Sequence, residues 1–191
     1  MKMKRNYPRY FLLAAVLLVL TGCAKPQLYG PQKYESAQDR FGAIELASSK
    51  KVYVCPAIDH LPLECRNQLD PGFIPGEYTT DAFEKELNAS GINPVRSTFA
   101  FDPSFSGLKQ AILDNADPSE DAAYLGVELL WSRNERWALD AKLFSADGNV
   151  MFEKRAICAM FGVYPVDPQE ITYMTLRQIL SDPEFRKALQ P

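Results

Sequence analysis

Apolar and polar residues alternate most clearly between residues 122 and 157, and an alternation of period two predicts β-strands. The apolar members of the first run are Leu125, Val127, Leu129 and Trp131, and those of the second are Trp137, Leu139, Ala141 and Leu143. Asn134-Glu135 predicts a turn between the runs, and Asp147-Gly148 tolerates the positive φ of a tight hairpin. With a return strand over Val150–Ile157, the sequence predicts a three-stranded antiparallel meander.

The residues before the meander mix strand and helix patterns. Lys51–Cys55 is short, contains β-branched valines and is ended by Pro56, as expected of a strand. A helix is predicted from Thr79 or Thr80 towards Gly91, because either threonine can cap it and acidic residues occupy its first turn.

Further elements complete the pattern on both sides of the meander. Ile92–Arg96 predicts a short or edge strand because it contains a proline, and a second helix opens at Ser106 or Gly107. Pro168–Leu180 predicts an amphipathic helix, and Pro183 starts a short final one. This order of elements predicts an α/β or α+β fold, in which helices cover a mixed sheet whose C-terminal half is the meander.

The N-terminus has a different composition. Four basic residues precede the ten-residue apolar run Phe11–Leu20, and the small or polar Thr21 and Gly22 separate that run from Cys23. This order is typical of an export signal. A bilayer core about 30 Å thick needs roughly 20 apolar residues in a helix, so the run is too short to span a membrane comfortably.

Leu20-Thr21-Gly22-Cys23 resembles the lipobox of bacterial lipoproteins. The resemblance implies cleavage before Cys23 and acylation of that cysteine, so that lipid chains such as palmitate fasten the mature protein to a membrane. Ala24 and Lys25 follow the cysteine, which in Gram-negative lipoproteins favours the outer membrane, with the domain facing the periplasm. A plasma-membrane lipoprotein is the alternative location, and an ordinary signal peptide with an incidental cysteine is the alternative to acylation.

These features divide the chain into three parts. Residues 1–22 are the expected signal peptide, residues 23–42 the lipidated N-terminus with a flexible tether, and residues 43–191 one globular periplasmic domain. The tether is polar, contains prolines and glycines, and has no sustained apolar period. In the alternative interpretation, Tyr34–Phe41 folds back onto the domain as a helix.

Charge limits the partners of the mature chain. Removal of the signal leaves 17 basic residues against 24 acidic ones, a net charge of about −7. Without a basic cluster, neither nucleic acid nor an anionic lipid surface is an expected partner of the domain. The expected contact with a membrane is through the lipid anchor.

Export places the three remaining cysteines in an oxidising compartment. Cys55 and Cys65 flank a proline-containing loop, and we expect a disulfide between them. Cys158 is then a buried thiol, whereas the competing pairing joins Cys55 to Cys158.

Residues with catalytic or metal-binding potential do not form a recognised pattern. His60 is the single histidine and stands beside Asp59, a pair without metal-ligand spacing. The sequence has no Gly-X-Ser-X-Gly elbow and no glycine-rich phosphate loop. We therefore expect a protein that is not an enzyme, with no metal site and no cofactor.

Two irregular segments carry apolar side chains suited to binding a partner. Long loops without their own structure are often functional. The first segment spans Asp59–Tyr78, the second Phe99–Phe105, and their candidate partner-binding residues are Leu61, Leu63, Phe73, Ile74, Phe99, Phe101 and Phe105. The alternative is that these side chains cover the sheet edge or the core.

The order of elements is similar to that of periplasmic domains of lipoproteins that activate cell-wall synthases or assemble secretion pores. This resemblance implies a non-catalytic envelope lipoprotein that binds another envelope protein in the assembly or activation of an envelope machine, and it predicts an exposed apolar patch. The alternative is a lipoprotein that binds a small ligand or glycan, which predicts a deep enclosed pocket beneath the sheet.

Overall fold

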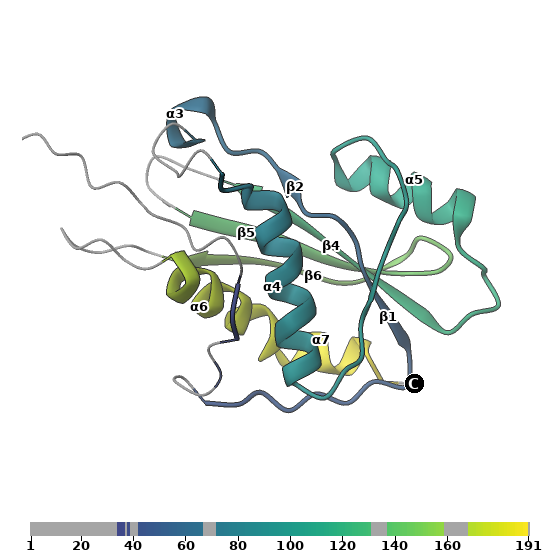
Figure 1. Ribbon diagram of the computed structural model, residues 1–191. Helices are drawn as coiled ribbons and strands as arrows, with labels where there is room; N and C mark the ends of the chain where they lie inside the picture. Colours follow the sequence, from purple (N-terminus) through teal and green to yellow (C-terminus); the bar gives the residue numbers. More distant parts are fainter. Residues whose placement is uncertain are drawn as a thin grey trace, which may run out of the picture.

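A mixed β-sheet with helices on both faces forms the fold of the computed structural model (Figure 1). The structure describes residues 34–36, 38, 42–66, 72–130, 137–158 and 168–190, and the structural statements below refer to these residues. The architecture is α+β with a mixed sheet, so the predicted fold class is confirmed.

The sheet has a parallel half and an antiparallel half, in the order β3-β1-β4-β5-β6. In the parallel half, β1 (Lys51–Val54) lies between β3 (Val95–Arg96) and β4 (Ala122–Leu130). In the antiparallel half, β4 pairs with β5 (Trp137–Ser145), and β5 pairs with β6 (Val150–Cys158). The predicted three-stranded meander is therefore confirmed.

A proline divides the strand that runs beside β4. Pro56 ends β1, and the chain returns to β4 as β2 (Ile58–Asp59). Two backbone hydrogen bonds hold the ends of this interruption, from Cys55 N to Leu125 O at 2.9 Å and from His60 N to Leu129 O at 3.0 Å. Proline lacks the N–H that a continuous ladder requires, which explains why one strand appears as two.

Helices α4 (Pro75–Ala89), α6 (Pro168–Leu180) and α7 (Pro183–Ala188) cover one face of the sheet, and α5 (Phe105–Asn115) covers part of the other (Figure 1). Helix α3 (Leu63–Arg66) is a single turn inside the predicted long loop. Among the described residues, no helix combines the length and the apolar character needed to cross a bilayer.

The first turns of two helices differ from the predicted ones. Helix α4 begins at Pro75 rather than at Thr79 or Thr80, because proline is well suited to the first helical position. Helix α5 begins before Ser106, because the Ser104 side chain caps it by accepting a hydrogen bond from Gly107 N at 3.0 Å.

Side chains of β4 alternate between two hydrophobic clusters, one on each face of the sheet. Leu125 and Leu129 point into the larger cluster beneath α4 and α6, whereas Tyr124 points into the smaller cluster beneath α5. At Gly126 a Cβ atom would stand 2.3 Å from Cδ2 of Leu108. The glycine therefore allows α5 to pack directly on the strand.

The segment before β1 belongs to the packed domain. We call the described residues 34–36, 38 and 42–48 the strap; these residues form no β-strand, and Tyr34 and Gln38 among them are 0% and 8% exposed. Gln38 has helical backbone geometry. Tyr34 and Gln38 therefore pack against the domain, whereas residues 37 and 39–41 lie outside the described residues.

Candidate partner-binding site

The first irregular segment places two of its four apolar candidates on the surface. Leu61 and Phe73 are buried in the larger cluster, where they cover the core. Leu63 on α3 and Ile74 before α4 are 71% and 54% exposed. An apolar side chain in water forfeits the stabilisation that burial would give, so these two residues are the better candidates for contact with a partner.

The second segment packs on the opposite face of the sheet. Phe99, Phe101 and Phe105 are half-buried against the smaller cluster. The Phe99 ring lies 5.8 Å from that of Tyr124, and the Phe105 ring 6.3 Å from that of Phe144. The two segments therefore do not combine into one apolar patch, and the three phenylalanines serve mainly to cover the sheet.

A cleft of about 450 Å³ lies beside the first turns of α4, and we call it the α4 cleft. Ile74 lies in its wall, and Leu63 belongs to the turn of α3 that ends at the lining residue Arg66. The cleft is lined by Pro56, Ala57, Asp59, Arg66, Ile74, Gly76, Glu77, Thr80 and Arg96. It is located at the carboxyl ends of the parallel strands β1 and β3, the edge at which open α/β sheets commonly bind ligands.

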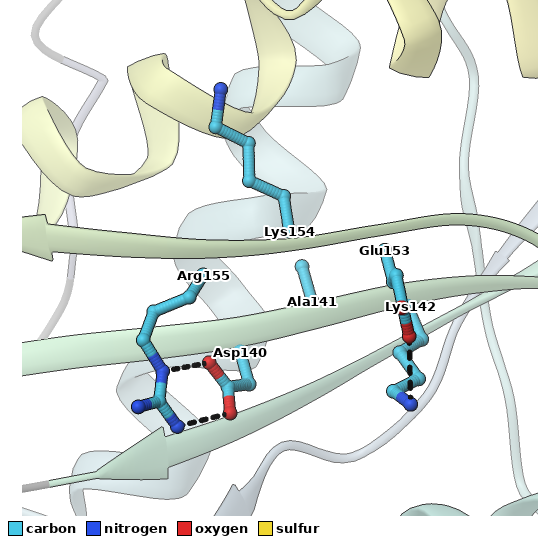
Figure 2. A pocket seen from close by; sticks show the side chains of 6 residues that line it. All are labelled: Asp140, Ala141, Lys142, Glu153, Lys154 and Arg155. Carbon is cyan, nitrogen blue, oxygen red and sulfur yellow. Dashed lines mark hydrogen bonds and ion pairs between the residues drawn. The ribbon is translucent and has the colours of Figure 1, made fainter.

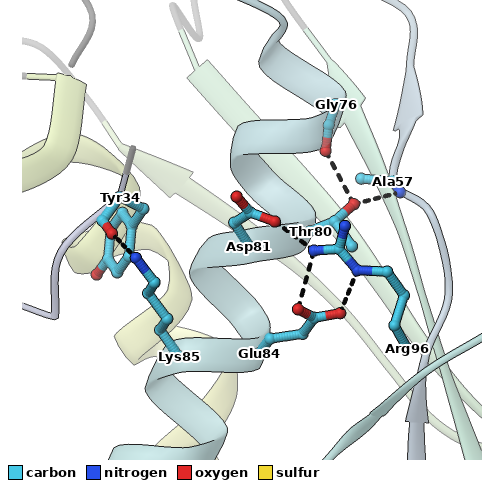
Figure 3. A network of polar contacts seen from close by, with 8 residues as sticks. All are labelled: Tyr34, Ala57, Gly76, Thr80, Asp81, Glu84, Lys85 and Arg96. Atoms are coloured by element: carbon cyan, nitrogen blue, oxygen red, sulfur yellow. Dashed lines mark hydrogen bonds and ion pairs between the residues drawn. The ribbon is translucent and has the colours of Figure 1, made fainter. Parts of the chain in front are cut away.

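Close packing of α4 against the link between β1 and β2 shapes the floor of the α4 cleft (Figure 3). The Thr80 hydroxyl donates to Gly76 O at 2.9 Å and accepts from Ala57 N at 2.8 Å. A Cβ atom on Gly76 would stand 3.0 Å from Ala57 O. Gly76 thus allows α4 to approach the link between β1 and β2 closely, and the Thr80 hydroxyl holds the two together.

Ion pairs form the rim of the α4 cleft. Arg96 on β3 binds Glu84 through Nε at 2.5 Å and Nη2 at 2.8 Å, and it also contacts Asp81 (Figure 3). The hydrogen bond with Glu84 raises the pKa of Arg96 above its usual range. Arg66 pairs with Asp59 at 3.1 Å. Both arginines already have carboxylate partners, so the lining combines apolar side chains with a rim of paired charges, as protein interfaces do.

The outer face of β5 and β6 forms a second cleft, of about 340 Å³ (Figure 2). Arg155 contacts Asp140 with two hydrogen bonds of 2.6 and 2.7 Å, and Lys142 pairs with Glu153 at 3.0 Å. These cross-strand pairs are typical of a solvated antiparallel face. Lys154 lies between Glu153 and Arg155 but points to the other face, so β6, an edge strand of the sheet, carries three successive charged residues. Charged side chains on an edge strand oppose its pairing with another sheet.

A third cleft, of about 480 Å³, separates α5 from the loop before it. It is lined by Ala100, Phe101, Asp102, Gly107, Gln110, Ala111, Asp114 and Asn115. All three clefts lie open to solvent, and none of the three is the deep enclosed pocket that binding of a small ligand beneath the sheet would require.

His60 lies near Glu128 on the outer face of the sheet. Their closest atoms, Nε2 and Oε1, are 4.0 Å apart, and the same carboxylate oxygen accepts a hydrogen bond from Phe105 N at 3.1 Å. Glu128 therefore binds the N-terminus of α5. In the part of the chain that the structure describes, no group of three or more His, Cys, Asp or Glu residues is arranged to hold a metal ion.

Cys55, which directly follows β1, is a free thiol buried in the smaller hydrophobic cluster, and burial raises its pKa to about 12. The structure does not show the expected disulfide between Cys55 and Cys65 or the competing one to Cys158. The side chains of Cys65 and Cys158 lie outside the described residues, as do Cys23 and the signal segment.

The sequence patterns missed the ion pairs of Arg96. Asp81 and Glu84 are three residues apart on a predicted helix, which places them on one face. The spacing of Asp81 and Glu84 therefore indicates that both could bind one cation. Their partner Arg96 lies on β3, and only the packing of β3 beside α4 identifies it.

No protein-family model matches the chain, and no curated protein matches it. The class that can be stated is therefore structural: an α+β domain with a mixed sheet and a meander at its C-terminal half.

Proposed function

We propose that the chain is a lipid-anchored, non-catalytic protein of the bacterial cell envelope whose domain binds another envelope protein. The observation that carries this proposal is the order of basic residues, apolar run and Leu20-Thr21-Gly22-Cys23. An acylated Cys23 would place the domain on the periplasmic side of the outer membrane. Replacement of Cys23 by serine should release the protein from the membrane fraction, and unchanged fractionation of that variant would contradict the anchor.

The α4 cleft supports the second part of the proposal. Leu63 and Ile74 offer apolar contact area, and fully burying a leucine or isoleucine side chain contributes roughly 1.5–3 kcal/mol. Paired charges surround them, as in the polar rim of an interface. Such a surface fits a protein segment that inserts apolar side chains near the N-terminus of α4.

The charge of the α4 cleft favours a partner segment with basic residues. Asp59, Glu77, Asp81 and Glu84 face two arginines at or near the cleft, which leaves the region acidic. The mature chain is itself acidic, with a net charge of about −7. Complementary potentials chiefly affect the rate and specificity of association, so binding should weaken as the salt concentration rises.

Photo-crosslinking tests the site directly. A photoreactive amino acid at residue 63 or 74 should give one reproducible crosslinked envelope protein in living cells. Leu113 on α5 and Val150 on β6 are the matched controls, because both are apolar and 48% exposed but distant from the α4 cleft. The same crosslinked product from all four positions, or none from residues 63 and 74, would contradict the assignment of this site.

A further inference from the structure

The two edges of the sheet differ in their protection against further pairing. The edge strand β6 carries Glu153, Lys154 and Arg155 in succession, and such charges oppose the addition of another strand. The opposite edge is β3, which is two residues long and exposed at both, with Val95 at 39%. Among the described residues, β3 has a strand neighbour on one side only.

The backbone of Arg96 faces away from that neighbour. β1 and β3 are parallel, with Tyr53 opposite Val95 and Val54 opposite Arg96. Alternate residues of a parallel strand bond to the same neighbour, and Ser97 N donates to Val54 O at 2.8 Å. Val95 and Ser97 therefore bond to β1, whereas the N–H and C=O of Arg96 point to the free side. No backbone oxygen in the described parts of the chain accepts a hydrogen bond from Arg96 N.

The side chain of Arg96 does not guard this edge. It lies against α4, where Nε and Nη2 bind Glu84 at 2.5 and 2.8 Å and the guanidinium also contacts Asp81 (Figure 3). Pro94 has no N–H, so it limits the length of any added ladder. β3 therefore offers a short stretch of free backbone whose one charged side chain is held on the helix.

A strand added beside β3 would meet different surroundings on its two faces, because its side chains alternate between them. On the α4 face, Asp81 and Glu84 bring two carboxylates to the single guanidinium of Arg96, and Glu77 lines the adjoining α4 cleft. On the opposite face lies the apolar, partly exposed Val95. Basic side chains would complement the first face and apolar side chains the second.

We propose that β3 accepts an extended segment of the partner protein as an added strand, in which basic residues facing α4 alternate with apolar residues facing Val95. Strand addition is a recurring mode of peptide recognition. Arg96 also lines the α4 cleft, so the same segment can continue along the cleft wall at Ile74. A second copy of this chain fits poorly, because the mature chain carries a net charge of about −7 and would bring like charges together. This inference deepens the proposed function and rests on it.

A synthetic peptide in which lysine and valine alternate tests the free edge, with fluorescence anisotropy and the full-length protein in detergent. The peptide should bind, and one with glutamate in place of lysine should bind at least tenfold more weakly. Arg96→Pro removes the outward N–H, whereas its matched control Arg96→Ala loses the same ion pairs but keeps the N–H. Arg96→Pro should bind roughly tenfold more weakly than Arg96→Ala. Equal affinities of the two variants, or no binding to wild type, would overturn strand addition.

Hydrogen exchange followed by NMR gives a readout that needs no variant. The alternating peptide should slow exchange of the wild-type Arg96 amide roughly tenfold or more, because that N–H gains an acceptor, and should leave the amides of β6 unchanged. An unchanged Arg96 amide would contradict the proposal. Protection that rises with protein concentration in the absence of peptide would assign the edge to a second copy and would equally overturn it.

Photo-crosslinking separates this inference from the proposed function. A photoreactive amino acid at residue 95 should give the same crosslinked envelope protein as one at residue 63 or 74. Crosslinks from residues 63 and 74 without that product from residue 95 would refute strand addition and leave the proposed site standing. The absence of crosslinks from all three positions would contradict the proposed function, and the peptide experiment would still decide whether the edge accepts a strand.

Discussion

Removal of one hydroxyl group should destabilise the domain measurably. Tyr34→Phe deletes the donor of the 2.7 Å bond to Glu86 Oε1 but keeps the buried ring. Because Glu86 is fully buried, water cannot replace the donor, and a hydrogen bond to a charged group contributes about 1.5–3 kcal/mol. We expect a loss of about 2 kcal/mol in the free energy of unfolding, which corresponds to roughly 4–8 °C in Tm for a domain of this size.

Urea unfolding followed by circular dichroism measures this loss, with Tyr53→Phe as the matched control. Tyr53 donates to Glu120 at the half-buried surface, where substitutions usually change stability by no more than about 0.5 kcal/mol. If Tyr34→Phe is no more destabilising than Tyr53→Phe, the strap does not depend on the buried Glu86 contact, and our reasoning about this network is wrong.

The pH dependence of the same variant gives an independent check. Burial, and next the hydrogen bond to Glu86, raise the pKa of Tyr34 above its ordinary value of 10.0. The resulting stability is fully present below pH 10 and is lost as the pH rises further, because the unfolded chain then releases a proton that the folded chain retains. The stability difference between wild type and Tyr34→Phe should therefore narrow above pH 10. A difference that stays constant or widens would contradict the assigned pKa shift.

Three further predictions concern other parts of the domain. Asp182 caps α7 and pairs with Lys154, whose hydrogen bond lowers the pKa of Asp182, so Asp182→Ala should cost about 1 kcal/mol or more at neutral pH. That cost should shrink as the pH falls below 3.8, and a constant cost in acid unfolding would contradict the ion pair. Gly126→Ala should cost about 1–3 kcal/mol in thermal unfolding, because its Cβ would stand 2.3 Å from Leu108 Cδ2, and a neutral effect would mean that α5 packs less closely. Cys55 should resist iodoacetamide in the folded protein at pH 8, because burial raises its pKa to about 12, and rapid labelling would contradict that environment.

Local patterns in the sequence were sufficient to predict the antiparallel half of the sheet. Alternating residues such as Leu125 and Leu143 face each other in the observed register, and Gly148 adopts a φ of +74° in the hairpin between β5 and β6. Both features depend on neighbours in the sequence: the pleat repeats every two residues, and the turn needs a residue without Cβ. Helices α6 and α7 begin at the predicted residues Pro168 and Pro183. Helices α4 and α5 were also predicted but begin earlier than expected, and the single turn α3 was not predicted.

Contacts between distant residues could not be predicted in this way. Tyr34 and Gln38 stand in a polar segment without apolar period, and their partner Glu86 lies 52 and 48 residues away. The exposure of Leu63 and Ile74, in contrast to the burial of Leu61 and Phe73, depends on where α3 and α4 begin. All four residues are apolar, so residue type alone does not distinguish those on the surface from those in the core.

Mass spectrometry of the mature N-terminus tests the central proposal most directly. The protein is purified in detergent from crosslinked envelopes, and both its N-terminal peptide and the proteins that accompany it are analysed. We expect a peptide that begins at Cys23 and carries acyl groups, together with one reproducible envelope partner. An unmodified Cys23, or a chain that retains residues 1–22, would contradict the lipid anchor on which the proposed location depends.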